Sequence, residues 1–356
     1  MRRAPVLSCA VVLAASLVSS GVAAQSISPL ATSPFESYLE ALRQQAGIPG
    51  ISAAIVQNGE VVWERGFGFQ NLEARIRATP DTPYPISGLT QALAGSLVLE
   101  CAEQRGVYLD DPASKYGVSL PETTATVREI LNHTSGAPPG ALFQFDPDRF
   151  GQLSHVIETC VPQPYRKTVA VRLLERFAMK DSVPGRDVQE EGVVAQTLFA
   201  ASVQDRYKDV LDRIAVPYKV DKKGRSSRSD IPIESMTAAT GVVSTVRDLA
   251  RFDAALDSAL LLREDTLTAA WTNAMGRDRM LPTGLGWFVQ NYNAEAIVWQ
   301  FGVMTGGYSS LILKIPAKRL TLVLLANSDG LCSPFDLSTG DVTKSLFALV
   351  FLRLFA

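Results

Sequence analysis

The chain of 356 residues carries 36 acidic and 34 basic side chains, a formal net charge of −2, with 47% hydrophobic and 20% charged residues. This composition is typical of a globular protein, and the slight acidity argues against nucleic acid or an anionic membrane as the main partner. The length allows two domains, or one large core with an inserted subdomain.

The N-terminus has the composition of a secretory signal peptide. Arginines at positions 2 and 3 precede an apolar run, 6–18, which is too short for a comfortable membrane span, and small residues lead up to Ala24. We therefore expect residues 1–24 to be a signal peptide cleaved after about Ala24. The remaining 25–356 should form one periplasmic or secreted domain with no membrane span.

Apolar residues at helical spacing predict a helix over 35–47, and two β-like runs follow at 51–56 and 61–64. Asn58-Gly59 between the two runs is a strong hairpin signal. The middle of the chain then shows mainly helical patterns interrupted by loops that contain proline and glycine. The expected helices and turns of this part cover 90–105, 127–131, 149–160, 168–178 and 246–257.

Near the C-terminus the pattern returns to strands, over 309–314 and 320–325, followed by an amphipathic helix over 343–355. Strands and helices at both chain ends around a helical middle predict an α/β (α+β) domain. We expect its sheet to be built from about 33–88 and 284–356, with a mainly helical insert over about 89–283.

Three cysteines remain after cleavage: Cys101, Cys160 and Cys332. An odd number in an oxidising compartment leaves at least one free thiol in a monomer. Cys101 continues an apolar helical stripe with Leu93 and Leu97, so we interpret it as a buried packing residue. A disulfide between Cys160 and Cys332 is left open.

The sequence contains no recognisable metal or cofactor motif. Its two histidines, His133 and His155, lack the spacing of metal ligands, and no CxxC pattern occurs. We therefore expect no metal and no cofactor.

The order of several short motifs gives the strongest indication of the fold. They are 47–50 (GIPG), Asn58-Gly59, 66–68 (GFG), 109–112 (LDDP), 132–136 (NHTSG), Ser244-Thr245, 248–250 (DLA) and 284–287 (GLGW). Together they resemble the β-lactamase-related serine hydrolases and penicillin-binding proteins, especially the class C β-lactamase, D-Ala-D-Ala carboxypeptidase and esterase branch. The resemblance implies a β-lactamase/transpeptidase-like fold, an antiparallel sheet flanked by N- and C-terminal helices with an inserted α-helical subdomain.

In this family an S-x-x-K motif supplies the nucleophile and its base. The matching segment, 84–91 (YPISGLTQ), has Gly88 at the Ser position and Gln91 at the Lys position. The spacing from Gly88 to Pro112 matches the family without a gap, which fixes the register. Glycine has no side chain with which to attack, and glutamine cannot accept the proton.

Two further family motifs also lack their expected side chains. Phe145 and Pro147 occupy the Tyr and Asn positions of Y-x-N, so the phenolic oxygen and the substrate-holding amide are missing. In the K-T-G or H-x-G motif, Phe301 occupies the Lys/His position and Val303 the Gly position, while an alternative register takes 304–306 (MTG) as the relic. Neither register supplies a cation for a substrate carboxylate.

A relocated nucleophile is the main alternative. Ser87 adjoins Gly88, but it directly precedes a helical pattern, where serine is a favoured N-cap, and we favour that structural role. Ser135 and His133 lie two residues apart in one turn, and we interpret both as structural.

The apolar residues Phe145, Phe301, Val303 and Met304 should converge on the old cleft if the fold is as expected. We favour a cleft that they fill over an apolar pocket for a ligand without a carboxylate.

Two functional hypotheses follow, and we favour the first. It is an exported, catalytically inactive family member that binds a cell-wall peptide, a small molecule or a protein partner. The second is a serine hydrolase of the β-lactamase, esterase or peptidase type with a relocated nucleophile. A purely structural subunit is a third, weaker interpretation.

Overall fold

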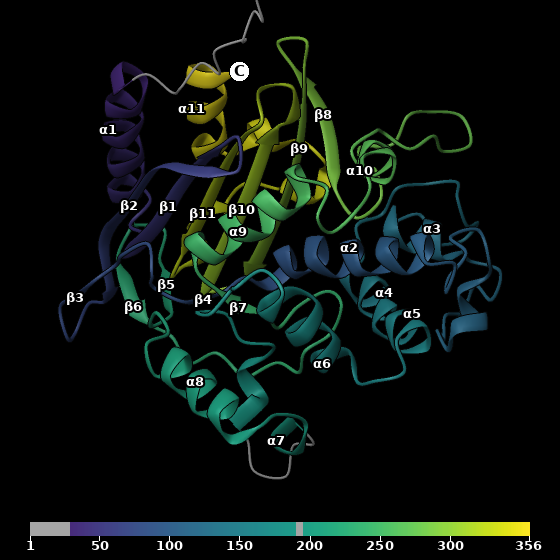
Figure 1. The fold of residues 1–356 in the computed structure, drawn as a ribbon. Coiled ribbons are helices and arrows are strands. Elements are labelled where there is room, and N and C mark those ends of the chain that lie inside the picture. Colours follow the sequence, from purple (N-terminus) through teal and green to yellow (C-terminus); the bar gives the residue numbers. More distant parts are fainter. Residues whose placement is uncertain (1–28, 190–194) are drawn as a thin grey trace, which may run out of the picture.

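The computed structural model describes residues 29–189 and 195–356 (Figure 1). The predicted signal peptide, 1–24, lies outside the described residues. Among the residues described, no helix combines the length and the apolar character needed to cross a membrane.

A seven-stranded antiparallel sheet forms the centre of the fold, in the order β3-β2-β1-β11-β10-β9-β8 (Figure 1). Its strands are β1 (Gly50–Gln57), β2 (Glu60–Asn71), β3 (Ile76–Arg77), β8 (Phe288–Tyr292), β9 (Glu295–Met304), β10 (Tyr308–Ile315) and β11 (Leu320–Ala326). The early strand β1 pairs with the last strand β11, with Ala54 opposite Val323. The prediction of an antiparallel sheet assembled from both chain ends is therefore confirmed.

The predicted hairpin between β1 and β2 is present. Asn58 and Gly59 both have positive φ angles, 55° and 80°. Positive φ at both central residues is what the tight turn that matches strand twist requires, and Asn-Gly adopts it at little cost.

Helices from the two chain ends cover one face of the sheet. They are α1 (Pro29–Gln45) and α11 (Leu346–Phe355), which lie side by side in Figure 1. Phe35 of α1 makes edge contacts with Trp63 of β2 and with Phe351 and Phe355 of α11, at ring-centroid distances of 5.3, 5.9 and 5.8 Å. This aromatic cluster joins both termini to the same side of the sheet.

The opposite face is covered by α9 (Val246–Asp257) and by the helical part of the chain. The side chain of Thr245 accepts a hydrogen bond from the Asp248 N–H and so caps α9, which begins at residue 246 as the sequence predicts. The other helices are α2 (Thr90–Glu103), α3 (Val127–Leu131), α4 (Pro147–Gly151), α5 (Leu153–Cys160), α6 (Tyr165–Val169), α7 (Ala195–Leu198), α8 (Ala201–Asp212) and α10 (Glu264–Ala270). Two small sheets, β4 (Tyr84–Pro85) with β7 (Val243–Ser244) and β5 (Tyr218–Val220) with β6 (Ser226–Arg228), interrupt the helical part.

The interpretation of Cys101 is confirmed for its burial and wrong for its chemistry, because its thiol is crosslinked. Cys101 of α2 forms a disulfide with Cys160 at the end of α5, with Cα atoms 6.0 Å apart. Cys332 is buried and free, so the Cys160–Cys332 pairing that the sequence left open does not form, and the expected free thiol is present. The apolar stripe does face the core, but that stripe packs on α5, and this packing brings Cys160 to Cys101.

Candidate functional site

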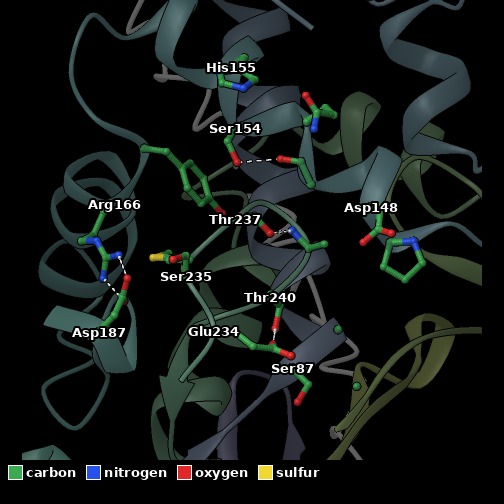
Figure 2. A pocket seen from close by; sticks show the side chains of 18 of the residues that line it. Ser87, Asp148, Ser154, His155, Arg166, Asp187, Glu234, Ser235, Thr237 and Thr240 are labelled. Carbon is green, nitrogen blue, oxygen red and sulfur yellow. Dashed lines mark hydrogen bonds and ion pairs between the residues drawn. The ribbon is translucent and has the colours of Figure 1, made fainter. Parts of the chain in front are cut away.

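A cavity of about 1010 Å³ lies where the end of β9, the 3-10 turn that precedes α2 and the helices α4 to α6 meet (Figure 2). Six of the residues that the sequence analysis singled out as site positions line it: Ser87, Gly88, Phe145, Pro147, Phe301 and Val303. The other four are not part of the lining: Gln91, His133 and Ser135 are buried, and Met304, which was expected at the cleft, is half-buried outside it. The family motifs therefore do converge on one cleft.

Gly88 lies in a single 3-10 turn, Ser87–Leu89, and touches β9 backbone to backbone. A Cβ atom built on Gly88 would lie 2.9 Å from the carbonyl oxygen of Phe301. On the facing strand, a Cβ on Gly302 would lie 2.2 Å from the Ile86 oxygen and 2.7 Å from the Gly88 nitrogen. Two glycines therefore allow a contact that side chains at either position would push apart.

The N-cap interpretation of Ser87 is wrong. Helix α2 begins at Thr90, and its N-cap residue, Leu89, makes no side-chain capping bond. Ser87 has a φ of 49°, whereas an N-cap residue has extended backbone angles. Its side chain is 4% exposed, and its hydroxyl has no hydrogen-bond partner among the described residues.

Gln91, at the family's base position, is held by His133. The Oε1 atom of Gln91 lies 3.1 Å from Nε2 of His133, and Nδ1 of His133 accepts a hydrogen bond from the Asp146 N–H at 3.1 Å. Because Nδ1 accepts, Nε2 carries the ring proton and donates it to Gln91. Burial lowers the pKa of His133 from 6.5 to about 4, with Asp146 opposing the shift. At neutral pH this imidazole is uncharged, and both of its nitrogens are occupied.

The burial of His133 predicts a loss of stability in mild acid. Its pKa is lower in the folded than in the unfolded chain, so the unfolded chain takes up the proton first as the pH falls below 6.5. The stability that the neutral, buried His133 contributes is fully present above pH 6.5, and about 3 kcal/mol of unfolding free energy is lost by pH 4. The unfolding free energy of His133→Gln, measured by urea denaturation from pH 7 to pH 4, should therefore fall less steeply with pH than that of the unmodified protein. The exposed His155, changed to Gln, serves as the control, and equal slopes in the two variants would contradict the prediction.

The segment that matches the family's Y-x-N motif starts helix α4. Asp146 is the N-cap of α4, and its side chain accepts a hydrogen bond from the Arg149 N–H at 3.0 Å. Pro147 follows at the first helical position, where its missing N–H costs nothing. Arg149 also donates to the carbonyl oxygen of Ser135 at 3.0 Å, which ties the turn of Ser135 to α4.

Aromatic side chains form one wall of the cleft. The rings of Phe145 and Phe301 lie 5.3 Å apart, and Phe145 also packs on His133 at 4.7 Å. The filled-cleft interpretation holds for this wall, where Phe301 is 4% exposed. It is wrong for the cleft as a whole, because the cavity remains beside Gly88 and Val303 is 42% exposed.

The polar side of the cleft was not predicted from the sequence. Figure 2 shows Arg166 and Asp187 joined in an ion pair, and Glu234 accepting a hydrogen bond from the Thr240 hydroxyl. These residues come from separated segments and belong to no motif that the sequence displays. Only their location in the fold identifies them.

The central antiparallel sheet, the terminal helices and the motifs at one cleft define the β-lactamase/transpeptidase class of fold. Residues 35–337 match the family described as Beta-lactamase, and the chain belongs to that family.

One curated relative and two solved structures illustrate the similarity. Protein flp of Staphylococcus aureus (strain MW2) is 23% identical over 325 residues, which are 80% of this chain and 60% of that protein. The chain thus spans less than two thirds of this relative's length. The octameric penicillin-binding protein homologue from Pyrococcus abyssi has a TM-score of 0.73 at 23% identity, covering 90% of this chain and 77% of that one. The D-alanine carboxypeptidase AmpC from Burkholderia cenocepacia has a TM-score of 0.68 at 19% identity, covering 90% and 98%. At these identities the two structures show that the fold is shared.

Proposed function

We propose that this protein is an exported, non-catalytic member of the β-lactamase family that binds a ligand in the cleft beside Gly88. The observation that carries the proposal is the backbone contact between Gly88 and the Phe301–Gly302 segment of β9. The nucleophile position has no side chain, and the strand that faces it occupies the space that a Cβ atom would need.

The surroundings of Gln91 support the same conclusion. Covalent catalysis needs a nucleophile activated by a base or by a lowered pKa. Gln91 accepts a hydrogen bond from a neutral, buried His133, and an amide does not take up protons at neutral pH. Removing nucleophile and base together costs about 10⁶ in turnover in a serine protease.

Export is supported by the Cys101–Cys160 disulfide in addition to the predicted signal peptide. Structural disulfides form and persist in oxidising compartments such as the periplasm and the extracellular space. A periplasmic or secreted location gives the protein access to a cell-wall peptide, a small molecule or an envelope protein as its partner.

Ser87 is the residue that keeps a hydrolase as the second candidate. It lines the cleft, and its hydroxyl is not used for capping or for any other hydrogen bond within the described residues. For the same reason it lacks the adjacent base that would activate it. His133 cannot replace that base, because its Nε2 is the donor to Gln91.

The test is exposure of the purified protein to a fluorescent penicillin and to a fluorophosphonate, followed by intact-mass measurement. We expect no adduct with either reagent, whereas a labelling-competent penicillin-binding protein run in parallel becomes modified. The double variant Gly88→Ser/Gln91→Lys should also stay unlabelled, because the Phe301 oxygen crowds position 88. A stoichiometric adduct that disappears in Ser87→Ala or Ser135→Ala would overturn the proposal in favour of a relocated nucleophile.

A further inference from the structure

We infer that the cleft selects a small organic cation, an amine carried on an apolar body, and discriminates against carboxylates. The inference rests on the proposed function, that this cleft binds a ligand. It concerns the chemical class of that ligand, which the charges and the unpartnered hydroxyls of the lining define.

The permanent positive charge of the lining is already neutralised. Among the described residues that line the cavity, Arg166 is the lone arginine or lysine. Its guanidinium donates to both carboxylate oxygens of Asp187, at 2.7 and 2.6 Å, and to the carbonyl oxygen of Pro184 at 2.7 Å. This pair is largely buried, with side-chain exposures of 13% and 7%. A ligand carboxylate would have to compete with a bidentate partner that is already in place.

Negative charge remains in excess. Asp148, Glu158 and Glu234 also line the cavity, and none of them faces a lysine or arginine in an ion pair that the described residues form. Within the described part of the chain, Glu234 accepts one hydrogen bond, from the Thr240 hydroxyl at 3.2 Å. Glu158 accepts from the Tyr165 N–H at 2.8 Å and lies 3.7 Å from His155. The lining is therefore rich in acceptors, and its field favours a positive ligand.

Two buried hydroxyls in the lining point independently to a polar ligand. Ser87 and Tyr165 are 4% and 3% exposed, and neither hydroxyl has a hydrogen-bond partner within the described residues. Burial raises the pKa of Tyr165, so its hydroxyl stays protonated. A buried polar group without a partner carries a free-energy cost. Both hydroxyl oxygens are enclosed in this structure, so a ligand that draws them toward the cavity by a side-chain rotation and hydrogen-bonds them removes that cost.

The rest of the lining suits an apolar body. Phe145, Phe301, Val303 and Met236 contribute apolar surface between the two polar ends. Aromatic faces also attract cations, which adds to the preference for an amine over an acid. The position where the family resemblance implies a lysine or histidine is Phe301, so no cation stands at that point.

The test compares probes that share one aromatic body and differ in charge. Phenethylamine and phenylalaninamide carry an amine, the second beside a carbonyl as at a peptide N-terminus, while 3-phenylpropanoate carries an acid. Binding to the full-length mature protein is measured by ligand-observed NMR titration at low salt. We expect the amines to bind about tenfold more tightly than the acid, and this ratio to shrink as salt screens the carboxylates.

The matched variants separate the lining charges from the overall charge of the protein. Asp148→Asn/Glu234→Gln should reduce the amine-to-acid ratio about fivefold. Glu60→Gln/Glu264→Gln, which removes the same number of charges at two exposed acids outside the lining, should leave it unchanged. Circular dichroism confirms that each variant folds. Tighter amine binding by phenylalaninamide than by phenethylamine would identify a peptide N-terminus as the source of the amine.

Three outcomes would overturn the inference: an acid that binds as tightly as the amines, a ratio that Asp148→Asn/Glu234→Gln does not change, or no binding by any probe. The failure of the proposed function looks different. Hydrolysis of phenylalaninamide, followed by mass spectrometry of the same samples, would show a catalyst, whatever charge the cleft prefers.

Discussion

The double variant Cys101→Ala/Cys160→Ala is expected to lose about 4 kcal/mol of unfolding free energy relative to the oxidised protein. The disulfide closes a loop between residues separated by 59 positions. Loss of the crosslink restores conformational freedom to the unfolded chain, and the chain-entropy relation for a loop of this length gives that magnitude. Urea or guanidinium denaturation at equilibrium measures the difference.

Reductant provides the internal control for the disulfide prediction. It should lower the stability of the unmodified protein to that of the double variant and leave the double variant unaffected. Cys332→Ala, which removes the buried free thiol, should keep the response to reductant. Equal effects of reductant on all three proteins would show that the disulfide does not carry the stability.

The disulfide should also affect ligand binding in the cleft. Cys101 lies in α2, whose N-terminal end follows Gly88, and Cys160 ends α5, which contributes Ser154 and Glu158 to the lining. The disulfide therefore connects α5, which lines the cavity, to α2, which begins two residues after the lining residue Gly88. Reduction should weaken binding of an amine probe at a reductant concentration that leaves most of the protein folded.

The hydrophobic pattern and the turn residues were sufficient to predict much of the fold. Helix α9 has the bounds that the sequence predicts, 246–257, because an apolar stripe and a threonine cap both mark them. Asn58-Gly59 located the first hairpin, and the strands at 309–314 and 320–325 lie within β10 and β11. These signals are local, so a single sequence contains them.

The pairing of cysteines could not be predicted in the same way. Cys101 lies on an apolar helical stripe that the sequence shows, but its distance from Cys160 cannot be deduced from the sequence. That distance depends on how α2 and α5 pack, which is a tertiary property. The expectation of packing was reasonable for the helix face and wrong for the chemistry of the thiol.

The candidate site also contains residues that local motifs identify and residues that only the fold brings together. Gly88, Phe145 and Phe301 could be located because each occupies a position in a spaced motif, and the structure brings them to one cavity. Ser87 was misinterpreted because its positive φ is a backbone property that its neighbours in the sequence do not reveal. The Arg166–Asp187 pair and Glu234 lie far apart in the chain, so only the fold identifies their common location.

Lys314→Met is expected to lose about 3 to 5 kcal/mol of unfolding free energy, because it leaves buried carboxylates without their partner. Lys314 of β10 is 1% exposed and forms ion pairs with Asp253 and Asp257 of α9. It also donates to the Thr321 hydroxyl at 3.1 Å, and its ammonium lies 5.3 Å from the ring of Trp271. Each aspartate already has one carboxylate oxygen without a hydrogen-bond partner in the part of the chain that is described.

The pH dependence distinguishes a buried charge from a simple packing defect. Burial raises the pKa of Asp253 even with Lys314 beside it, and removal of the lysine raises it further. A folded-state pKa above the unfolded value means that the folded variant binds protons more readily, so its deficit is greatest at neutral pH and shrinks as the pH falls. A packing defect would give a deficit that does not depend on pH.

Replacing the whole buried cluster separates the effect of charge from the effect of side-chain shape. Lys314→Met/Asp253→Leu/Asp257→Leu removes all three charges, and apolar replacement of a buried ion cluster is often neutral or stabilising. We therefore expect the triple variant to recover most of the stability that Lys314→Met loses, as measured by denaturant titration at pH 7. If the triple variant were as unstable as the single one, the lost stability would come from the shape of the lysine side chain, and the buried charges would not be the cause.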